Sequence, residues 1–214
     1  MEQVLQFLSY ILLVVAALIP IANPFSTAPM FLSLTQDFSK QERQKAVNLA
    51  TLYMFLLLSV FLIFGVQLLA FFGIELTSLR IAGGLIIGYL GFRMLFPAPI
   101  SMPGGLTQQT TANDIAFMPL AMPSMSGPGA ISVVIAMAAR INTAETLQDE
   151  LYGYIVVIAG IAVAALICWI VLSAATKVVK FMGVNGIIAM TKVMGFFLIS
   201  IGVDMVVNTI RSFF

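Results

Sequence analysis

Histidine is absent from this 214-residue sequence, and Cys168 is its single cysteine. One cysteine excludes an intrachain disulfide and a zinc site built from several thiolates. Without histidine and without clustered carboxylates, the chain lacks the side chains on which metal-assisted and ordinary acid–base catalysis usually depend. The sequence therefore predicts a protein that is not an enzyme and that uses no metal or organic cofactor.

Charged side chains are also scarce. Lys, Arg, Asp and Glu make up 9% of the residues and leave a net charge of +1. Soluble globular domains carry about a quarter charged residues, so this composition excludes that class. A nucleic-acid partner is excluded as well, because neutralising phosphates requires a basic face that the chain does not have.

Long apolar runs dominate what remains. Hydrophobic residues make up 61% of the chain, and the mean hydropathy is +1.08. A membrane-spanning helix needs about 20 consecutive apolar residues, whereas the strands of a membrane barrel show short alternating segments. The sequence therefore predicts an all-α polytopic membrane protein with six membrane segments, at about 4–22, 49–72, 81–96, 115–139, 151–172 and 187–210. The first run carries Glu2 in place of a basic leader region, so it is interpreted as a retained span and not a signal peptide.

A proline-rich motif occurs twice at a constant offset of 99 residues. Residues 20–34 read PIANPFSTAPMFLSL, and residues 119–133 read PLAMPSMSGPGAISV. Three prolines match between the two copies, and Thr27 falls opposite Ser126. A proline inside a helix removes a backbone hydrogen bond and costs roughly 3 kcal/mol or more, so segments 1 and 4 are predicted to break here. Helix breaks repeated in hydrophobic segments indicate a transporter binding site.

The repeat divides the chain into two halves. Residues 1–97 form the first three-helix repeat, residues 98–113 form a linker rich in Pro, Gly and hydroxyl side chains, and residues 114–214 form the second repeat. Three crossings per half force the halves into opposite orientations, so the sequence predicts two inverted repeats with both motifs near the membrane midplane. A weaker match sets Arg80-x-x-Gly83 against Lys192-x-x-Gly195 at an offset of 112.

Lys and Arg are divided unequally between the two sides of the predicted bundle. The connections between segments 1 and 2, 3 and 4, and 5 and 6 hold or flank seven of them, and the opposite side has three. Cytoplasmic connections are enriched in Lys and Arg, so both termini are predicted to lie outside.

The broken segments offer groups that could bind a small solute. Unwinding frees backbone N–H and C=O groups, and the half-helix that follows begins with a positive partial charge suited to a carboxylate. Hydroxyl side chains stand at the expected start of each half-helix, and an asparagine amide adds a donor and an acceptor. The predicted substrate-binding residues, suited to a small zwitterion, are Asn23, Pro24, Ser26, Thr27, Pro123, Ser124, Ser126, Gly127 and Gly129. In the alternative interpretation the Pro and Gly residues only kink helices for packing, while Ser and Thr satisfy the local backbone.

Asp204 lies inside the last predicted span. An ionisable residue there is costly and is by default a functional hypothesis. It is the candidate for ion coupling, with H⁺ or Na⁺ as the coupling ion. The alternative, in which Asp204 only reaches a lipid headgroup or Arg211 near the membrane surface, stays open.

These motifs resemble the MarC family of bacterial and archaeal inner-membrane proteins, which includes a group of small neutral amino acid transporters of the SnatA type. The resemblance rests on Asn23-Pro24 followed by Pro29, on LRIAGGL at 79–85, on PLAMP at 119–123 with Gly127-Pro128-Gly129, and on Met194-Gly195. It covers essentially the full chain. It implies six membrane segments in two inverted halves, a place in the inner membrane, and movement of glycine, alanine or similar amino acids.

The sequence thus favours a secondary transporter of small neutral amino acids, driven by an ion gradient or working as an exporter. A lipid-carrier or lipophilic-compound translocase is the alternative, although the intramembrane stretches offer few of the cations it would need. The expected partners are the amino acid and membrane lipids. A homo-oligomer formed through the glycine-rich spans at 81–96 and 187–210 is left open.

Overall fold

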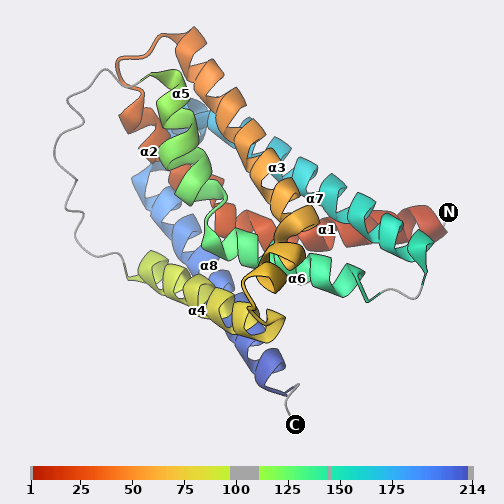
Figure 1. The fold of residues 1–214 in the computed structure, drawn as a ribbon. Coiled ribbons are helices and arrows are strands. Elements are labelled where there is room, and N and C mark those ends of the chain that lie inside the picture. The colour runs from red at the N-terminus through yellow and green to blue at the C-terminus, as the bar shows by residue number, and fades with distance from the viewer. Residues whose placement is uncertain (1, 97–110, 144–145, 212–214) are drawn as a thin grey trace.

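The computed structural model describes residues 2–96, 111–143 and 146–211, and every described element is a helix (Figure 1). In chain order these are α1 (Glu2–Ala22), α2 (Pro24–Leu34), α3 (Lys40–Phe71), α4 (Leu76–Leu95), α5 (Ala112–Ile115), η1 (Ala116–Met125), α6 (Pro128–Ile141), α7 (Leu147–Ser173) and α8 (Ala175–Arg211). Most of the predicted linker lies outside the described residues. Its last part does not remain a linker, because Thr111 caps α5 and the helix begins at Ala112.

Five described helices are long and apolar enough to cross a membrane: α1, α3, α4, α7 and α8. The pair formed by residues 112–125 and α6 passes the same test together, with a bend of 63° at its break, and supplies a sixth span if it is counted as one. The predicted all-α, multi-pass class is therefore confirmed. The breaks in segments 1 and 4 are confirmed as well, since α1 ends at Ala22 and η1 ends at Met125.

Several helices begin earlier than the apolar runs that predicted them. α3 starts at Lys40 and not at 49, because Ser39 and Glu42 form a capping box that satisfies the first turn. α7 starts at Leu147 and not at 151, with Thr146 accepting from the backbone N–H of Asp149. α8 starts at Ala175 and not at 187, and it is kinked at Gly183, whose φ is 64°.

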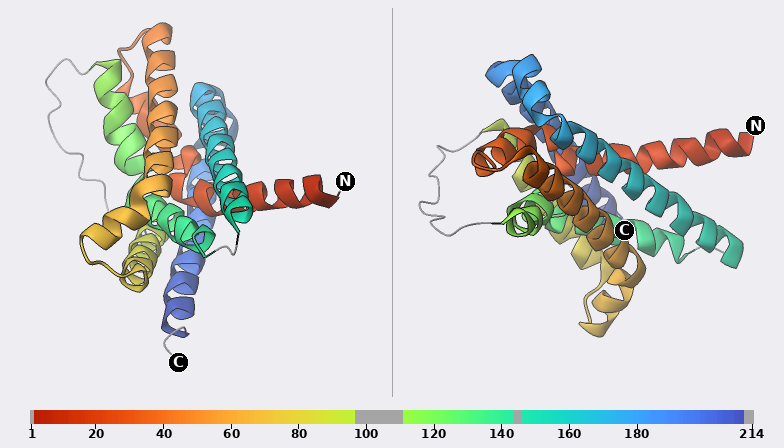
Figure 2. Two further views of the ribbon diagram at one scale, coloured as in Figure 1. Left: turned by 45° about the vertical axis from the view of Figure 1, so that its right-hand side comes forward. Right: turned by 90° about the horizontal axis from the view of Figure 1, so that it is seen from above.

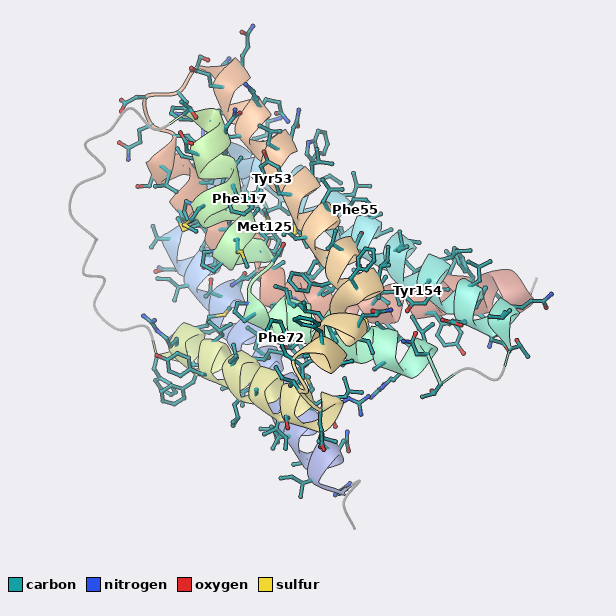
Figure 3. The ribbon with its side chains drawn as sticks, in the orientation of Figure 1. Tyr53, Phe55, Phe72, Phe117, Met125 and Tyr154 are labelled. Carbon is teal, nitrogen blue, oxygen red and sulfur yellow. The ribbon has the colours of Figure 1, made fainter. Side chains whose placement is uncertain are left out.

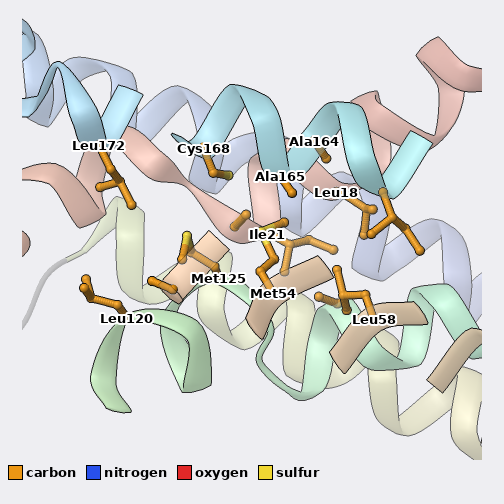
Figure 4. Packing of buried hydrophobic residues seen from close by; sticks show 14 of the residues in the cluster. Leu18, Ile21, Met54, Leu58, Leu120, Met125, Ala164, Ala165, Cys168 and Leu172 are labelled. Carbon is orange, nitrogen blue, oxygen red and sulfur yellow. The ribbon is translucent and has the colours of Figure 1, made fainter. Parts of the chain in front are cut away.

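The buried core lies where the broken helices meet the long ones. α1 contributes Leu18 and Ile21, α3 contributes Met54 and Leu58, and α7 lies over them with Cys168, which is fully buried (Figure 4). The ring of Phe117 in η1 packs edge-on against Tyr53 of α3 at 5.6 Å between centroids (Figure 3). The N-terminal part of α1 extends beyond the rest of the bundle (Figure 2).

Glycines allow α4 and α8 to pack backbone to backbone. A Cβ on Gly84 would lie 2.7 Å from the carbonyl oxygen of Gly202, and a Cβ on Gly195 would lie 2.8 Å from that of Gly91. Such spacing excludes any larger residue at these positions, as is common where membrane helices approach closely. This α4–α8 contact lies within the chain.

Several helix ends line two separate cavities. The end of α2, the start of α3 and the junction of α7 with α8 line one cavity. The start of α4 and the C-terminal parts of α6 and α8 line another. α4 and α8 run antiparallel, with Gly91 facing Gly195. Arg93 and Lys192 therefore lie at a similar height along the α4–α8 pair.

Candidate functional site

The first break is a single residue, Asn23, in the left-handed conformation with φ 33° and ψ 66°. Asparagine tolerates this conformation because its short polar side chain can bond locally. Its Oδ1 accepts from the backbone N–H of Ser26 at 3.3 Å and so caps α2, which begins with Pro24. Proline is favoured at the first helical position because it lacks an N–H that would have no partner there. Pro20 and Pro29, by contrast, stay inside α1 and α2.

The Asn23 amide also has donor capacity that the fold hardly uses. The side chain is only 5% exposed, and its Nδ2 reaches the thioether sulfur of Met94 in α4 at 3.9 Å. A thioether is a weak acceptor, and an amide nitrogen carries two donors. Asn23 therefore presents a buried donor that a stronger acceptor would satisfy better.

The second break runs through Ser126 and Gly127. The residues before it form the π-helix η1, with Met118 and Met122 in extended conformation and cis peptide bonds before Pro119 and Pro123. A Cβ on Gly127 would lie 2.6 Å from the carbonyl oxygen of Pro123, so the turn requires glycine there. α6 begins only at Pro128, which means that Ser124 and Ser126 precede this half-helix and do not form its first turn as predicted.

The two motifs meet at a pair of hydroxyl groups. The Thr27 and Ser124 hydroxyl oxygens are 3.0 Å apart, and Thr27 Oγ1 also lies 3.1 Å from the carbonyl oxygen of Asn23, which can only accept. A hydroxyl has one proton to donate. When Thr27 donates it to Asn23, the Ser124 hydroxyl donates to Thr27, and the two broken segments are linked.

Ser126 is the exception among the buried polar groups of this region. Its side chain is 0% exposed, and its hydroxyl oxygen has no hydrogen-bond partner among the described residues, a property that it shares with Ser59 of α3. More than about 90% of buried polar groups in folded proteins are paired, so an unpaired one calls for an explanation. Here the unpaired hydroxyl lies in the break itself, immediately before the N-cap residue of α6.

Not every predicted substrate-binding residue is buried where the two breaks meet. Ser26 and Pro123 are exposed, and only the backbone N–H of Ser26 takes part in the cap. Gly129 is buried for packing, since a Cβ there would lie 2.9 Å from a side-chain carbon of Ile87. Pro24 and Gly127 shape the two breaks.

Asp204 belongs to a different part of the molecule. It is exposed on α8, where one carboxylate oxygen accepts from Asn208 Nδ2 at 2.8 Å. It lines a cavity of about 310 Å³ together with Arg80 of α4 and Arg140 of α6. Sequence reasoning missed these arginines and Met94 as neighbours of the candidate residues, because nothing in the local sequence signals which helices will pack together. Among the described residues, no group of three or more Cys, Asp or Glu side chains could hold a metal ion.

Comparison with known proteins gives consistent results over nearly the whole chain. The model of a family described as MarC family integral membrane protein matches residues 8–214. The UPF0056 inner membrane protein MarC of Escherichia coli O1:K1 / APEC is 36% identical over 203 residues, 90% of each chain. The protein of that name from Escherichia coli strain K12 is 35% identical over the same length and share. No solved structure matches the chain.

Proposed function

The chain belongs to the MarC family of integral membrane proteins, and from this premise we propose that it is a secondary transporter of small neutral amino acids of the glycine or alanine type. It is a multi-pass protein of the inner membrane. Its substrate would bind where the two broken segments meet and would cross by alternating access, the mechanism common to carriers built on broken helices.

The unpaired hydroxyl of Ser126 is the observation that carries this proposal. A buried hydroxyl without a partner typically costs about 1–3 kcal/mol. A ligand group that bonds to Ser126 would remove it. The Thr27–Ser124 hydrogen bond supports the same location, because it joins the two motifs beside this break.

The start of α6 supports a carboxylate at this place. Gly127 caps α6 without a side-chain hydrogen bond, and Gly129 and Ala130 in the first turn of the helix are buried. The first N–H groups of a helix have no partner within the helix and carry a positive partial charge that favours an anion. The Asn23 amide, held only by Met94, would add a further donor.

The burial of the residues at the two breaks favours a substrate with a small side chain. Asn23, Thr27 and Ser126 are 5%, 3% and 0% exposed, so the site is occluded in this conformation and the half-helices must move to admit a solute. We propose that the amino acid is neutral, since no charged side chain is among the predicted binding residues.

The inverted arrangement of the two halves is part of this proposal. An offset of 111 carries Gly84 to Gly195 and Gly91 to Gly202. The contact of Gly84 with Gly202 therefore becomes the contact of Gly195 with Gly91 when the halves are exchanged. A two-fold axis relating the halves would produce this reciprocity, and the register differs by one residue from the predicted 112.

Coupling is assigned to Asp204, with H⁺ or Na⁺ as the ion. The carboxylate shares its cavity with two guanidinium groups and forms no ion pair with either of them. None of the predicted substrate-binding residues lines this cavity, so coupling would act through movement of α8 and not by direct contact with the amino acid.

Counterflow of labelled glycine or alanine in proteoliposomes tests the proposal. We expect uptake above that of empty liposomes, competition by small neutral amino acids, and none by charged ones. No uptake for any of several amino acids would overturn the assignment of substrate.

A further inference from the structure

Two adjacent cavities lie on the side of the bundle where α7 joins α8. The first, of about 320 Å³, is lined by Lys40, Arg43 and Gln44 of α3. The second, of about 330 Å³, is lined by Trp169 and Lys177. Ser173 and Thr176 line both, so the two cavities form one continuous surface, here called the α3/α7 groove.

The charge of this groove is positive and uncompensated. Lys40, Arg43 and Lys177 line it, and no described acidic residue does. None of the three is within ion-pair distance of a described carboxylate. The Arg43 guanidinium donates to the carbonyl oxygens of Thr35 and Gln36 at 2.8 and 3.0 Å, which fixes its position without neutralising its charge.

Side-chain hydrogen bonds connect α3 and α7 beside the groove. Gln44 Nε2 donates to Asn48 Oδ1 at 2.9 Å and to Ser173 Oγ at 3.1 Å. Trp169 Nε1 donates to the same Asn48 oxygen at 2.7 Å. Tryptophan is enriched at the level of lipid headgroups, where its ring is partly in the apolar layer and its N–H in the polar one. Trp169 therefore marks this level on α7.

Below the polar network the surface becomes apolar. Leu52 and Leu56 on α3 and Leu166 and Ile170 on α7 are each about half exposed. They stand within two helical turns of Asn48 and Trp169, on two helices that pack against each other. A basic cavity above two rows of exposed apolar side chains matches the two ends of a phospholipid.

We infer that the α3/α7 groove binds a phospholipid with an anionic headgroup. Lys40, Arg43 and Lys177 hold the phosphate, and the Ser173 and Thr176 hydroxyls bond to its oxygens or to the glycerol. The acyl chains lie along the exposed leucines and Ile170. Basic cavities between membrane helices on the cytoplasmic side are suited to such headgroups, and this is the side to which most Lys and Arg are assigned. The site is separate from the proline motifs and does not depend on the proposed transport.

Binding is measured by native mass spectrometry and by thermal unfolding of the detergent-solubilised full chain. The probes are dioleoylphosphatidylglycerol, dioleoylphosphatidylethanolamine and inorganic phosphate. We expect phosphatidylglycerol alone to remain bound and to raise the unfolding temperature. Each cation contributes roughly fivefold to such binding, so Lys40→Gln with Lys177→Gln should weaken it by about 25-fold. Lys40→Arg with Lys177→Arg should retain it.

Lys45→Gln with Lys180→Gln is the matched control, because these lysines lie in the same parts of α3 and α8 but do not line the groove. Arg43 is left intact in all variants, since it also holds the α2–α3 connection. An equal loss in the control pair would overturn the inference, as would equal binding of phosphatidylethanolamine. Stabilisation by inorganic phosphate alone would show a free-anion site and would overturn it too.

Discussion

The hydroxyl oxygens of Thr27 and Ser124 lie 3.0 Å apart although the residues are separated by 97 positions in the chain. This hydrogen bond joins the first turn of α2 to the π-helix before α6, and so links the two copies of the proline motif. The junction, the ion-coupling candidate and the packing that holds the halves together can each be tested by substitution.

The Thr27–Ser124 hydrogen bond should give a measurable coupling energy between substitutions of the two residues. In a double-mutant cycle with Thr27→Val and Ser124→Ala, we expect the two losses of stability to be non-additive by about 0.6 kcal/mol, the average for hydrogen bonds between membrane helices. Unfolding in detergent measures all four proteins. Strictly additive losses would contradict the hydrogen bond.

Ser126→Ala should affect stability and transport in opposite ways. Removing an unpaired buried hydroxyl leaves the unfolding free energy unchanged or raises it, whereas transport of glycine or alanine should fall because a ligand partner is lost. Ser132→Ala is the control on α6, since that hydroxyl already donates to the carbonyl of Pro128 at 2.9 Å. Normal transport by Ser126→Ala would move the site elsewhere.

Asn23 can be tested without disturbing its backbone. Glycine accepts a φ of 33°, so Asn23→Gly removes the amide and keeps the break; we expect reduced transport with normal expression. Asn23→Ala should lose transport as well and should cost roughly 1–2 kcal/mol more in stability, because alanine is strained in this conformation. Transport rates and unfolding are measured on both variants. Wild-type rates in Asn23→Gly would exclude the amide as a ligand.

Asp204→Asn should change the pH or Na⁺ dependence of transport while leaving expression normal. The substitution keeps the shape of the side chain and removes the charge that faces Arg80 and Arg140 across the cavity. Rates are compared over a range of pH and Na⁺ concentration in proteoliposomes. Asn208→Ala is the control, since it removes the hydrogen bond to Asp204 and retains the carboxylate. An unchanged profile in Asp204→Asn would make Asp204 a structural residue.

The α4–α8 contact offers a matched pair of glycines. A Cβ on Gly84 meets the backbone of Gly202, so Gly84→Ala should destabilise the protein by about 1–3 kcal/mol through overpacking. A Cβ on Gly88 has open space around it, and Gly88→Ala should be neutral or slightly stabilising. Thermal unfolding distinguishes the two. Equal effects would show that the helices are not in close contact.

The helix breaks could be predicted because they follow from local chemistry. Pro24 and Pro128 lack an N–H and begin the helices that follow the two breaks, and the repetition of prolines in apolar segments is enough to indicate that both segments break. The early start of α3 could have been predicted too: Ser39 followed by Glu42 is a capping-box signature that the polar character of that stretch concealed.

The long-range neighbours could not be predicted from local patterns. Asn23 meets Met94, and Asp204 shares a cavity with Arg80 and Arg140, only because α1, α4, α6 and α8 pack in one particular way. That Ser126 lacks a partner depends on every side chain around it. Pro20 and Pro29 look like further breaks in the sequence, but neighbouring helices and local adjustments allow proline to remain inside membrane helices.

Because Cys168 is completely buried, the natural protein should not react with water-soluble thiol reagents. A cysteine introduced at a helix end is then the sole reactive thiol on the whole molecule, with no engineering of the background. Lys45→Cys and Arg140→Cys, placed on opposite sides of the bundle, would report in intact cells which side faces the medium and hence how the protein is inserted.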